Sequence, residues 1–172
     1  MMRHSHFRNV KRDELQPGDV VHYPFLFPWQ RDGGVSVAEK LRPCVVMLRF
    51  GPQEEPYLAL VPLTTRPIRD WEQRVLIPQN ARASAGLNPG RAQSIVVDSC
   101  NIERIHPADD RDAKTNLPAI VQVGTLGPVL LDEVCRRFKN LQMRSKVHVV
   151  KREAPAAAPA PEPEAFTPIP GY

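Results

Sequence analysis

The sequence contains few cysteines, few aromatic residues and no long apolar segment. Three of its 172 residues are cysteine and 6% are aromatic. The cysteines are far apart and none forms a C-x-x-C pair, so we expect neither a disulfide framework nor a zinc site. Each one lies in an apolar stretch, which favours a small buried thiol at Cys44, Cys100 and Cys135.

No run of about 18 apolar residues is present, so the sequence predicts no transmembrane helix and no membrane partner. The N-terminus is basic, but no hydrophobic segment of the kind found in secretion signals follows it. A hydrophobic content of 42% and a charged content of 24% are ordinary for a soluble globular protein. We therefore expect the protein to be cytoplasmic.

Common enzyme motifs are missing as well. The sequence has no glycine-rich phosphate loop, no H-E-x-x-H helix and no G-x-S-x-G turn. Nothing in it predicts a cofactor or a metal ion. Catalytic residues must therefore be sought in less specific patterns.

The net charge of +4 arises mainly at the N-terminus. Residues 1–12 contain four basic residues and no acidic one, whereas residues 13–150 carry 17 basic and 16 acidic residues. Residues 151–172 are rich in alanine and proline and cannot build a core. We predict a basic flexible arm over 1–12, one domain over 13–150 and a disordered tail over 151–172.

Short apolar segments bounded by turn residues predict a mainly β domain. The strands expected are 20–25, 43–49, 57–63, 72–77, 93–98 and 101–105. The second is continuously apolar, which indicates burial on both faces, and its short connection to the third favours antiparallel pairing. A long connection over 26–40 separates the first strand from the second.

One helix is predicted near the C-terminus, with Pro128 in its first turn. Leu130, Val134, Phe138 and Leu141 recur at helical spacing and form an apolar stripe that we expect to pack on the sheet. Strands without βαβ alternation, followed by one helix, predict a compact antiparallel sheet or a small barrel.

The most informative residues lie at the ends of two neighbouring predicted strands. Arg42 precedes the second strand, and Thr64 follows the third. An arginine offers a planar fork of N–H donors that suits a phosphate group, and a threonine adds a hydroxyl donor to the same oxygens. We interpret the pair as a phosphodiester site that needs no metal. The alternative is an arginine in a surface ion pair beside a threonine that merely favours β structure.

The order of several short motifs resembles that of the MazF/PemK family, the toxins of bacterial toxin–antitoxin pairs. The motifs are Gly18-Asp19-Val20-Val21, Lys40-Leu41-Arg42-Pro43-Cys44-Val45-Val46-Met47, Leu60-Val61-Pro62-Leu63-Thr64-Thr65, Gly86-Leu87, Ser94-Ile95-Val96-Val97-Asp98 and Gly124-Thr125-Leu126. The similarity covers roughly residues 16–142. The loop before Arg42 departs from the family, because it is long and lacks the Glu-Gln pair of many relatives.

The resemblance implies a small SH3-like antiparallel barrel with a C-terminal helix, usually present as a homodimer. It also implies an endoribonuclease that cleaves single-stranded RNA, such as mRNA, without a metal and so inhibits translation and growth. A cognate antitoxin protein would neutralise it, and contact with DNA would occur only indirectly through that antitoxin. The family's catalytic arginine and threonine map onto Arg42 and Thr64, and Thr65 matches the hydroxyl residue that follows.

Further residues are candidates for substrate binding, and the general base stays open. Arg66 adds a cation directly after the threonines, and His22 on the first strand is a candidate base or a structural residue. Asp98 could contact RNA, hold Arg42 or simply form a turn. Trp29 in the long connection could stack on a base, contact a partner or lie in the core.

Two other functions remain compatible with the sequence. One is a non-enzymatic toxin on the same barrel that inhibits DNA gyrase, as CcdB does. The other is a catalytically inactive RNA-binding module derived from the toxin fold.

Overall fold

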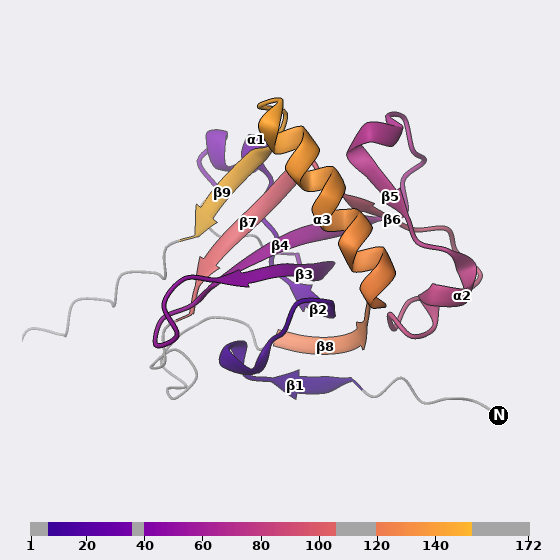
Figure 1. The fold of residues 1–172 in the computed structure, drawn as a ribbon, viewed down its shortest axis with the longest axis horizontal. Helices are drawn as coiled ribbons and strands as arrows, with labels where there is room; N and C mark the ends of the chain where they lie inside the picture. Colours follow the sequence, from indigo (N-terminus) through magenta and orange to yellow (C-terminus); the bar gives the residue numbers. More distant parts are fainter. Residues whose placement is uncertain (1–6, 36–39, 106–119, 153–172) are drawn as a thin grey trace, which may run out of the picture.

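The computed structural model describes residues 7–35, 40–105 and 120–152, which form a mainly β molecule (Figure 1). Its strands are β1 (Arg8–Val10), β2 (Asp19–Tyr23), β3 (Arg42–Phe50), β4 (Tyr57–Thr64), β5 (Arg74–Leu76), β6 (Ser94–Val96), β7 (Ser99–Arg104), β8 (Ile120–Thr125) and β9 (His148–Arg152). Its helices are α1 (Pro28–Asp32), α2 (Gln79–Arg82) and α3 (Pro128–Met143), with short 3-10 turns at η1 (Arg12–Glu14) and η2 (Trp71–Gln73).

The nine strands form one sheet whose main order is β1-β8-β2-β3-β4-β6-β5. Strand β7 pairs with β4, and β9 extends the sheet beyond β7. The pairing between β3 and β4 is antiparallel, as predicted, and β7 and β9 form the one parallel pair among the described strands. Among the described strands, no pairing that would close the sheet into a barrel is found.

The centre of the sheet is buried on both faces. On β3, Val45 and Met47 enter one apolar core, whereas Cys44 and Val46 enter the other. Successive residues of a strand point to opposite faces, so a continuous apolar run supplies both cores at once. The prediction that this strand is buried on both sides is therefore confirmed.

Helix α3 lies across one face of the sheet (Figure 1), where its stripe covers the core that contains Val45. Val134, Phe138 and Leu141 are buried, and Leu130 packs against the same core while partly exposed. The expected packing of the helix on the sheet is confirmed. Within the described residues, one more strand, β9, follows the helix.

Both predicted domain boundaries need correction. Strand β1 pairs with β8, and the buried Arg12 forms an ion pair of 2.8 Å with Glu103, so residues 8–12 are ordered parts of the fold and not a flexible arm. At the other end, β9 extends to Arg152, two residues past the expected limit of the domain. Residues 1–6 of the predicted arm and 153–172 of the predicted tail lie outside the described residues.

Candidate functional site

A cavity of about 500 Å³ lies where the ends of several strands meet α1. Its walls come from seven elements and the segments beside them, namely α1, β3, β4, β5, β6, β7 and β9. The lining residues are Phe27, Pro28, Trp29, Asp32, Arg42, Thr64, Arg66, Arg74, Val96, Asp98, Ser99 and His148. Four of the six predicted site residues therefore meet in one place.

Arg42 and Thr64 lie at the same end of two neighbouring strands and line the same cavity. The antiparallel ladder of β3 and β4 ends at the pair of Cys44 and Pro62, two residues after Arg42 on one strand and two residues before Thr64 on the other. Both residues are half-buried, which leaves their polar groups accessible to a ligand in the cavity.

The hydroxyl of Thr64 is oriented by the turn that follows its strand. Its Oγ1 accepts a hydrogen bond of 3.1 Å from the backbone N–H of Arg66. A threonine hydroxyl also carries one O–H donor, and this contact leaves that donor for a ligand. The same turn brings the Arg66 side chain back to the cavity.

The Arg42 guanidinium rests on an aromatic wall. Its Cζ lies 5.2 Å from the centroid of the Phe27 ring, and Phe27 stacks on Trp29 with centroids 6.0 Å apart. Within the described residues, no ion pair or hydrogen bond engages this guanidinium. Its N–H donors are therefore available for an anion. Trp29 is 67% exposed, so its placement in the core is excluded.

Asn101 holds the backbone that leads into the aromatic wall. Its side-chain Oδ1 accepts a bond of 2.9 Å from the N–H of Leu26, and its Nδ2 donates one of 2.7 Å to the carbonyl of the same residue. Asn101 is fully buried, so no water replaces these bonds. The amide group thus fixes the chain one residue before Phe27.

We expect Asn101→Ala to lower the free energy of unfolding by about 2–4 kcal/mol, because it leaves a buried N–H and a buried carbonyl without partners. Urea denaturation followed by circular dichroism measures this loss. The exposed Asn140 on α3 provides a matched control, and Asn140→Ala should change stability by less than about 0.5 kcal/mol. Equal stability of the two variants would contradict the anchoring role.

Asp98, Ser99 and His148 also line the cavity. The carbonyl of Asp98 accepts a bond of 2.8 Å from the N–H of His148, and Ser99 pairs with His148 in the parallel ladder of β7 and β9. Three arginines and two aspartates line the cavity, which gives it a formal charge of +1 from these groups. An anionic ligand is therefore favoured electrostatically.

His22 and Thr65 are not among the lining residues. His22 pairs with Pro43, and adjacent residues of a strand point to opposite faces, so it is turned away from the face of Arg42. Its ring lies 6.4 Å from that of Phe7. Thr65 is exposed beyond the end of β4. The structure therefore places neither residue in the cavity.

Sequence reasoning missed four polar residues of the cavity, namely Asp32, Arg74, Ser99 and His148. Arg74 belongs to none of the motifs that the sequence offers, and Asp32 lies in the long connection over 26–40. His148 opens a five-residue strand that carries only two apolar residues, which are too few to reveal an alternating pattern. Only the fold brings these positions together.

The cysteines differ in their burial. Cys44 and Cys100 are buried as predicted, whereas Cys135 is only half-buried on α3, which corrects the expectation for that residue. Burial raises the pKa of the Cys44 thiol far above its ordinary value, although the nearby Arg42 charge opposes the shift. Burial also raises the pKa of Cys100 to about 12. Both therefore stay as protonated thiols, which are poor nucleophiles.

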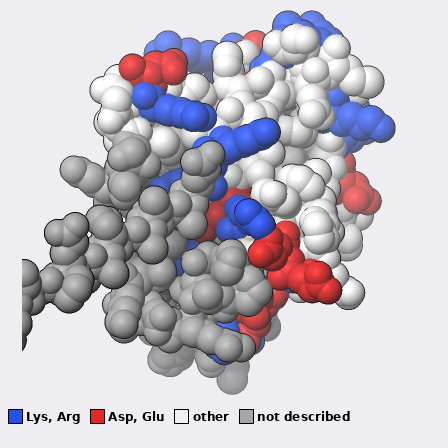
Figure 2. All heavy atoms as spheres, turned by 90° about the vertical axis from the view of Figure 1, so that its left-hand side faces the viewer, with Lys and Arg blue, Asp and Glu red and all other residues white. Residues whose placement is uncertain are grey.

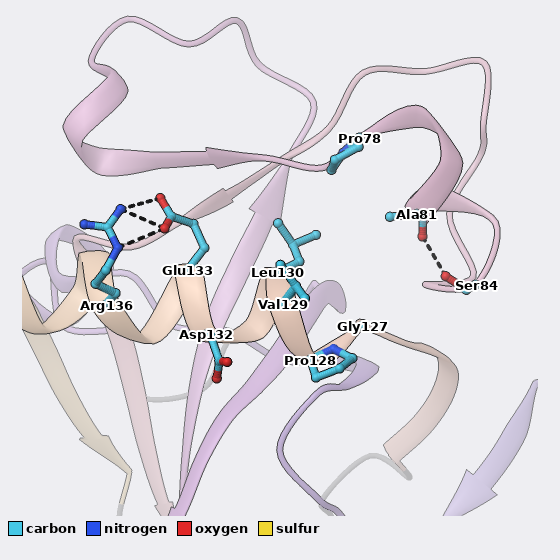
Figure 3. Close-up of a pocket in the computed structure, with 10 residues that line it drawn as sticks. All are labelled: Pro78, Ala81, Ser84, Gly127, Pro128, Val129, Leu130, Asp132, Glu133 and Arg136. Carbon is cyan, nitrogen blue, oxygen red and sulfur yellow. Dashed lines mark hydrogen bonds and ion pairs between the residues drawn. The ribbon is translucent and has the colours of Figure 1, made fainter.

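A second cavity of about 660 Å³ lies between α2 and the first turns of α3 (Figure 3). Its lining is mostly apolar, and the Arg136 guanidinium is bound by the Glu133 carboxylate at 2.7 Å. Arg136 holds the pKa of that carboxyl below its ordinary value, so the pair persists near neutral pH. The Asp132 side chain points away from Pro78 and Ala81 in Figure 3. The cavity that contains Arg42 is therefore better suited to a polar ligand than this second cavity.

The face shown in Figure 2 carries both basic and acidic side chains of the described residues. Among those residues, no group of three His, Cys, Asp or Glu side chains is placed to hold a metal ion. No described helix is long and apolar enough to cross a membrane. Binding of an anionic ligand would thus depend on the local arrangement in the cavity.

No protein-family model matches the chain, and no curated protein matches it.

Proposed function

We propose that this protein is a metal-independent endoribonuclease that cleaves single-stranded RNA, with the 2′-hydroxyl of the RNA as the nucleophile. The observation that supports the proposal is that Arg42 and Thr64, from the same end of two paired strands, line one cavity, where no described residue occupies the donors of the Arg42 guanidinium. RNA supplies its own nucleophile beside each phosphate, so the protein has only to position the scissile phosphate and stabilise the charge that grows on its oxygens. The cavity offers the groups for that task.

On this proposal, each residue of the cavity has a role that suits its chemistry. Arg42 binds two phosphoryl oxygens through its planar fork and stabilises the charge that grows on them. Thr64 donates its hydroxyl to one of the same oxygens from the facing strand. Arg66 and Arg74 lie in the same cavity and compensate the charge of the phosphate group.

The aromatic wall suits the bases of a single strand. Trp29 is largely exposed and stacked on Phe27, so one of its faces is open to an unpaired base. Stacking of this kind contributes about 1–3 kcal/mol for each base and tolerates different sequences. A base that follows or precedes the bound phosphate would therefore rest beside Arg42.

The biological setting is also a proposal. The motif order resembles that of MazF/PemK toxins, so we propose a type II toxin that cleaves mRNA and inhibits growth until a cognate antitoxin binds it. On this proposal the protein forms a homodimer of SH3-like barrels and meets DNA only through the antitoxin. Co-expression with a small acidic protein encoded beside it should then restore growth.

The reaction is tested with a long RNA of mixed sequence in the presence of EDTA, followed by synthetic oligonucleotides that contain a mapped cleavage site. We expect products that end in a 2′,3′-cyclic phosphate and a 5′-hydroxyl. A single 2′-deoxy substitution at the nucleotide before the scissile phosphate should abolish cleavage, because the nucleophile is removed.

Two results would contradict the proposal. Cleavage of the 2′-deoxy oligonucleotide at the same bond would require a different nucleophile. Binding of RNA without cleavage in any buffer would identify an inactive RNA-binding module.

A further inference from the structure

Strand β9 carries one histidine into the cavity from outside the region that resembles the toxin family. His148 is the first residue of β9, and its side chain lines the same cavity as Arg42 and Thr64. The residue is exposed, so its imidazole is accessible to both substrate and water. The resemblance ends near residue 142, and no family expectation applies to this position.

The backbone of β9 is held at both ends, which fixes where the histidine lies. At its start, the N–H of His148 donates to the carbonyl of Asp98 at 2.8 Å. At its end, the guanidinium of Arg152 lies 5.5 Å from the Tyr23 ring centroid and donates to the carbonyl of Pro24. The parallel pairing with β7 joins these two anchors. His148 is therefore placed by the sheet and not by a free terminus.

The proposed reaction needs a group that accepts a proton, and the cavity offers few. Arginine is protonated at all accessible pH values and cannot serve as a base in its ordinary state. Carboxylates are weak bases near neutral pH, whereas an imidazole is the side chain best matched to proton transfer there. The charged groups that line the cavity with His148 are Arg42, Arg66, Arg74, Asp32 and Asp98.

We propose that His148 is the general base of the cleavage, an inference that rests on the proposed ribonuclease function. The neutral imidazole takes the proton of the 2′-hydroxyl while the 2′-oxygen forms a bond to phosphorus. The bond between phosphorus and the 5′-oxygen breaks, and the leaving oxygen takes a proton from water at the open cavity. The imidazolium then returns its proton to water, so the step is balanced in protons and electrons.

The test compares His148→Ala and His148→Gln with the unaltered full-length protein. Each variant should lower kcat/KM for RNA cleavage by about 10²–10⁴-fold. The unaltered protein should gain activity with rising pH as the base loses its proton, and the variants should lack that acidic limb. Added imidazole should restore part of the activity of His148→Ala, because the exposed position leaves room for it.

Two controls separate catalysis from structure. Affinity for an uncleavable 2′-deoxy oligonucleotide should stay within about threefold in both variants, because the phosphate clamp is untouched. His22→Gln changes a histidine outside the cavity and should keep both the rate and the pH profile.

The outcomes for the two proposals can be distinguished. If the unaltered protein fails to cleave RNA, the proposed function itself fails. If it cleaves RNA but the His148 variants retain its rate and pH profile, only the role of His148 is overturned. A loss of rate without rescue by imidazole and with weakened oligonucleotide binding would likewise overturn the base and indicate a binding role.

Discussion

Arg42→Ala is expected to lower kcat/KM for RNA cleavage by about 10³-fold, because it removes two charged donors from the scissile phosphate. Arg42→Lys should recover little of this loss, since an ammonium group cannot reproduce the planar fork. Thr64→Val should cost about 10²-fold through the loss of one donor, whereas Thr64→Ser keeps the hydroxyl and should stay within about tenfold. Rates measured in EDTA with a fluorescent oligonucleotide provide the comparison.

The double variant tests whether the two residues act on the same group. Arg42 and Thr64 line one cavity and on the proposed mechanism share one phosphate, so their combined loss should be smaller than the product of the single losses. Arg91 is an exposed arginine outside the cavity, and Arg91→Ala should leave the rate unchanged. Undiminished cleavage in both single variants, with folding intact, would remove the pair from the active site.

The presence of Arg42 and Thr64 at the same end of two paired strands could be predicted because it depends on local sequence. β3 and β4 are joined by six residues, Gly51–Pro56, and both are strongly apolar, so an antiparallel hairpin was the natural expectation. Once that hairpin forms, the residue before one strand and the residue after the other must lie near each other. The chemistry of arginine and threonine then indicates a phosphate.

Other parts of the site depend on contacts that no short stretch of sequence reveals. β9 pairs with β7 in parallel, across about fifty residues of chain, and its alternation is too short to recognise. β8 contains Gly124, a residue that normally weakens a strand prediction. His22 was misplaced for a related reason, because the face that a strand residue occupies depends on its register with a neighbour. His148 therefore lines the cavity although the sequence did not predict it, and His22 does not line it although the sequence made it a candidate.

Gly86 and Gly124, which belong to two of the motifs named above, each occupy a position where a side chain would collide with backbone atoms. Gly86 follows α2 with φ of 71°, and Gly124 lies on β8. A Cβ atom on Gly124 would lie 2.2 Å from the carbonyl carbon of Ala85, and one on Gly86 would lie 1.9 Å from the carbonyl oxygen of Val123. The two backbones touch at this point, and the N–H of Thr125 donates to the carbonyl of Ser84 at 2.9 Å. The contact fastens the segment that carries α2 to the sheet.

We expect Gly124→Ala to lower the free energy of unfolding by about 4 kcal/mol or more, well above the typical effect of a point substitution. The added methyl group meets the backbone atoms of the peptide group between Ala85 and Gly86, and backbone cannot rotate away as a side chain can. Ala85 is fully buried and Val123 nearly so, so neither strand nor loop can move without opening the core. Gly86→Ala should be at least as damaging, since it adds the cost of a left-handed backbone for a residue with a Cβ.

Thermal and urea denaturation of the purified variants measure this effect, with Gly90→Ala as the matched control. A Cβ on Gly90 would lie 3.4 Å from the Asn88 side-chain oxygen in an exposed turn, so its substitution should change stability by less than about 0.5 kcal/mol. A domain of this size is commonly stable by only about 5–15 kcal/mol, so the Gly124 variant should lose most of its margin and be recovered in low yield. Unfolding of Gly124→Ala at the same urea concentration as Gly90→Ala would show that the two backbones separate at little cost. In that case the loop that carries α2 would be free to move relative to β8.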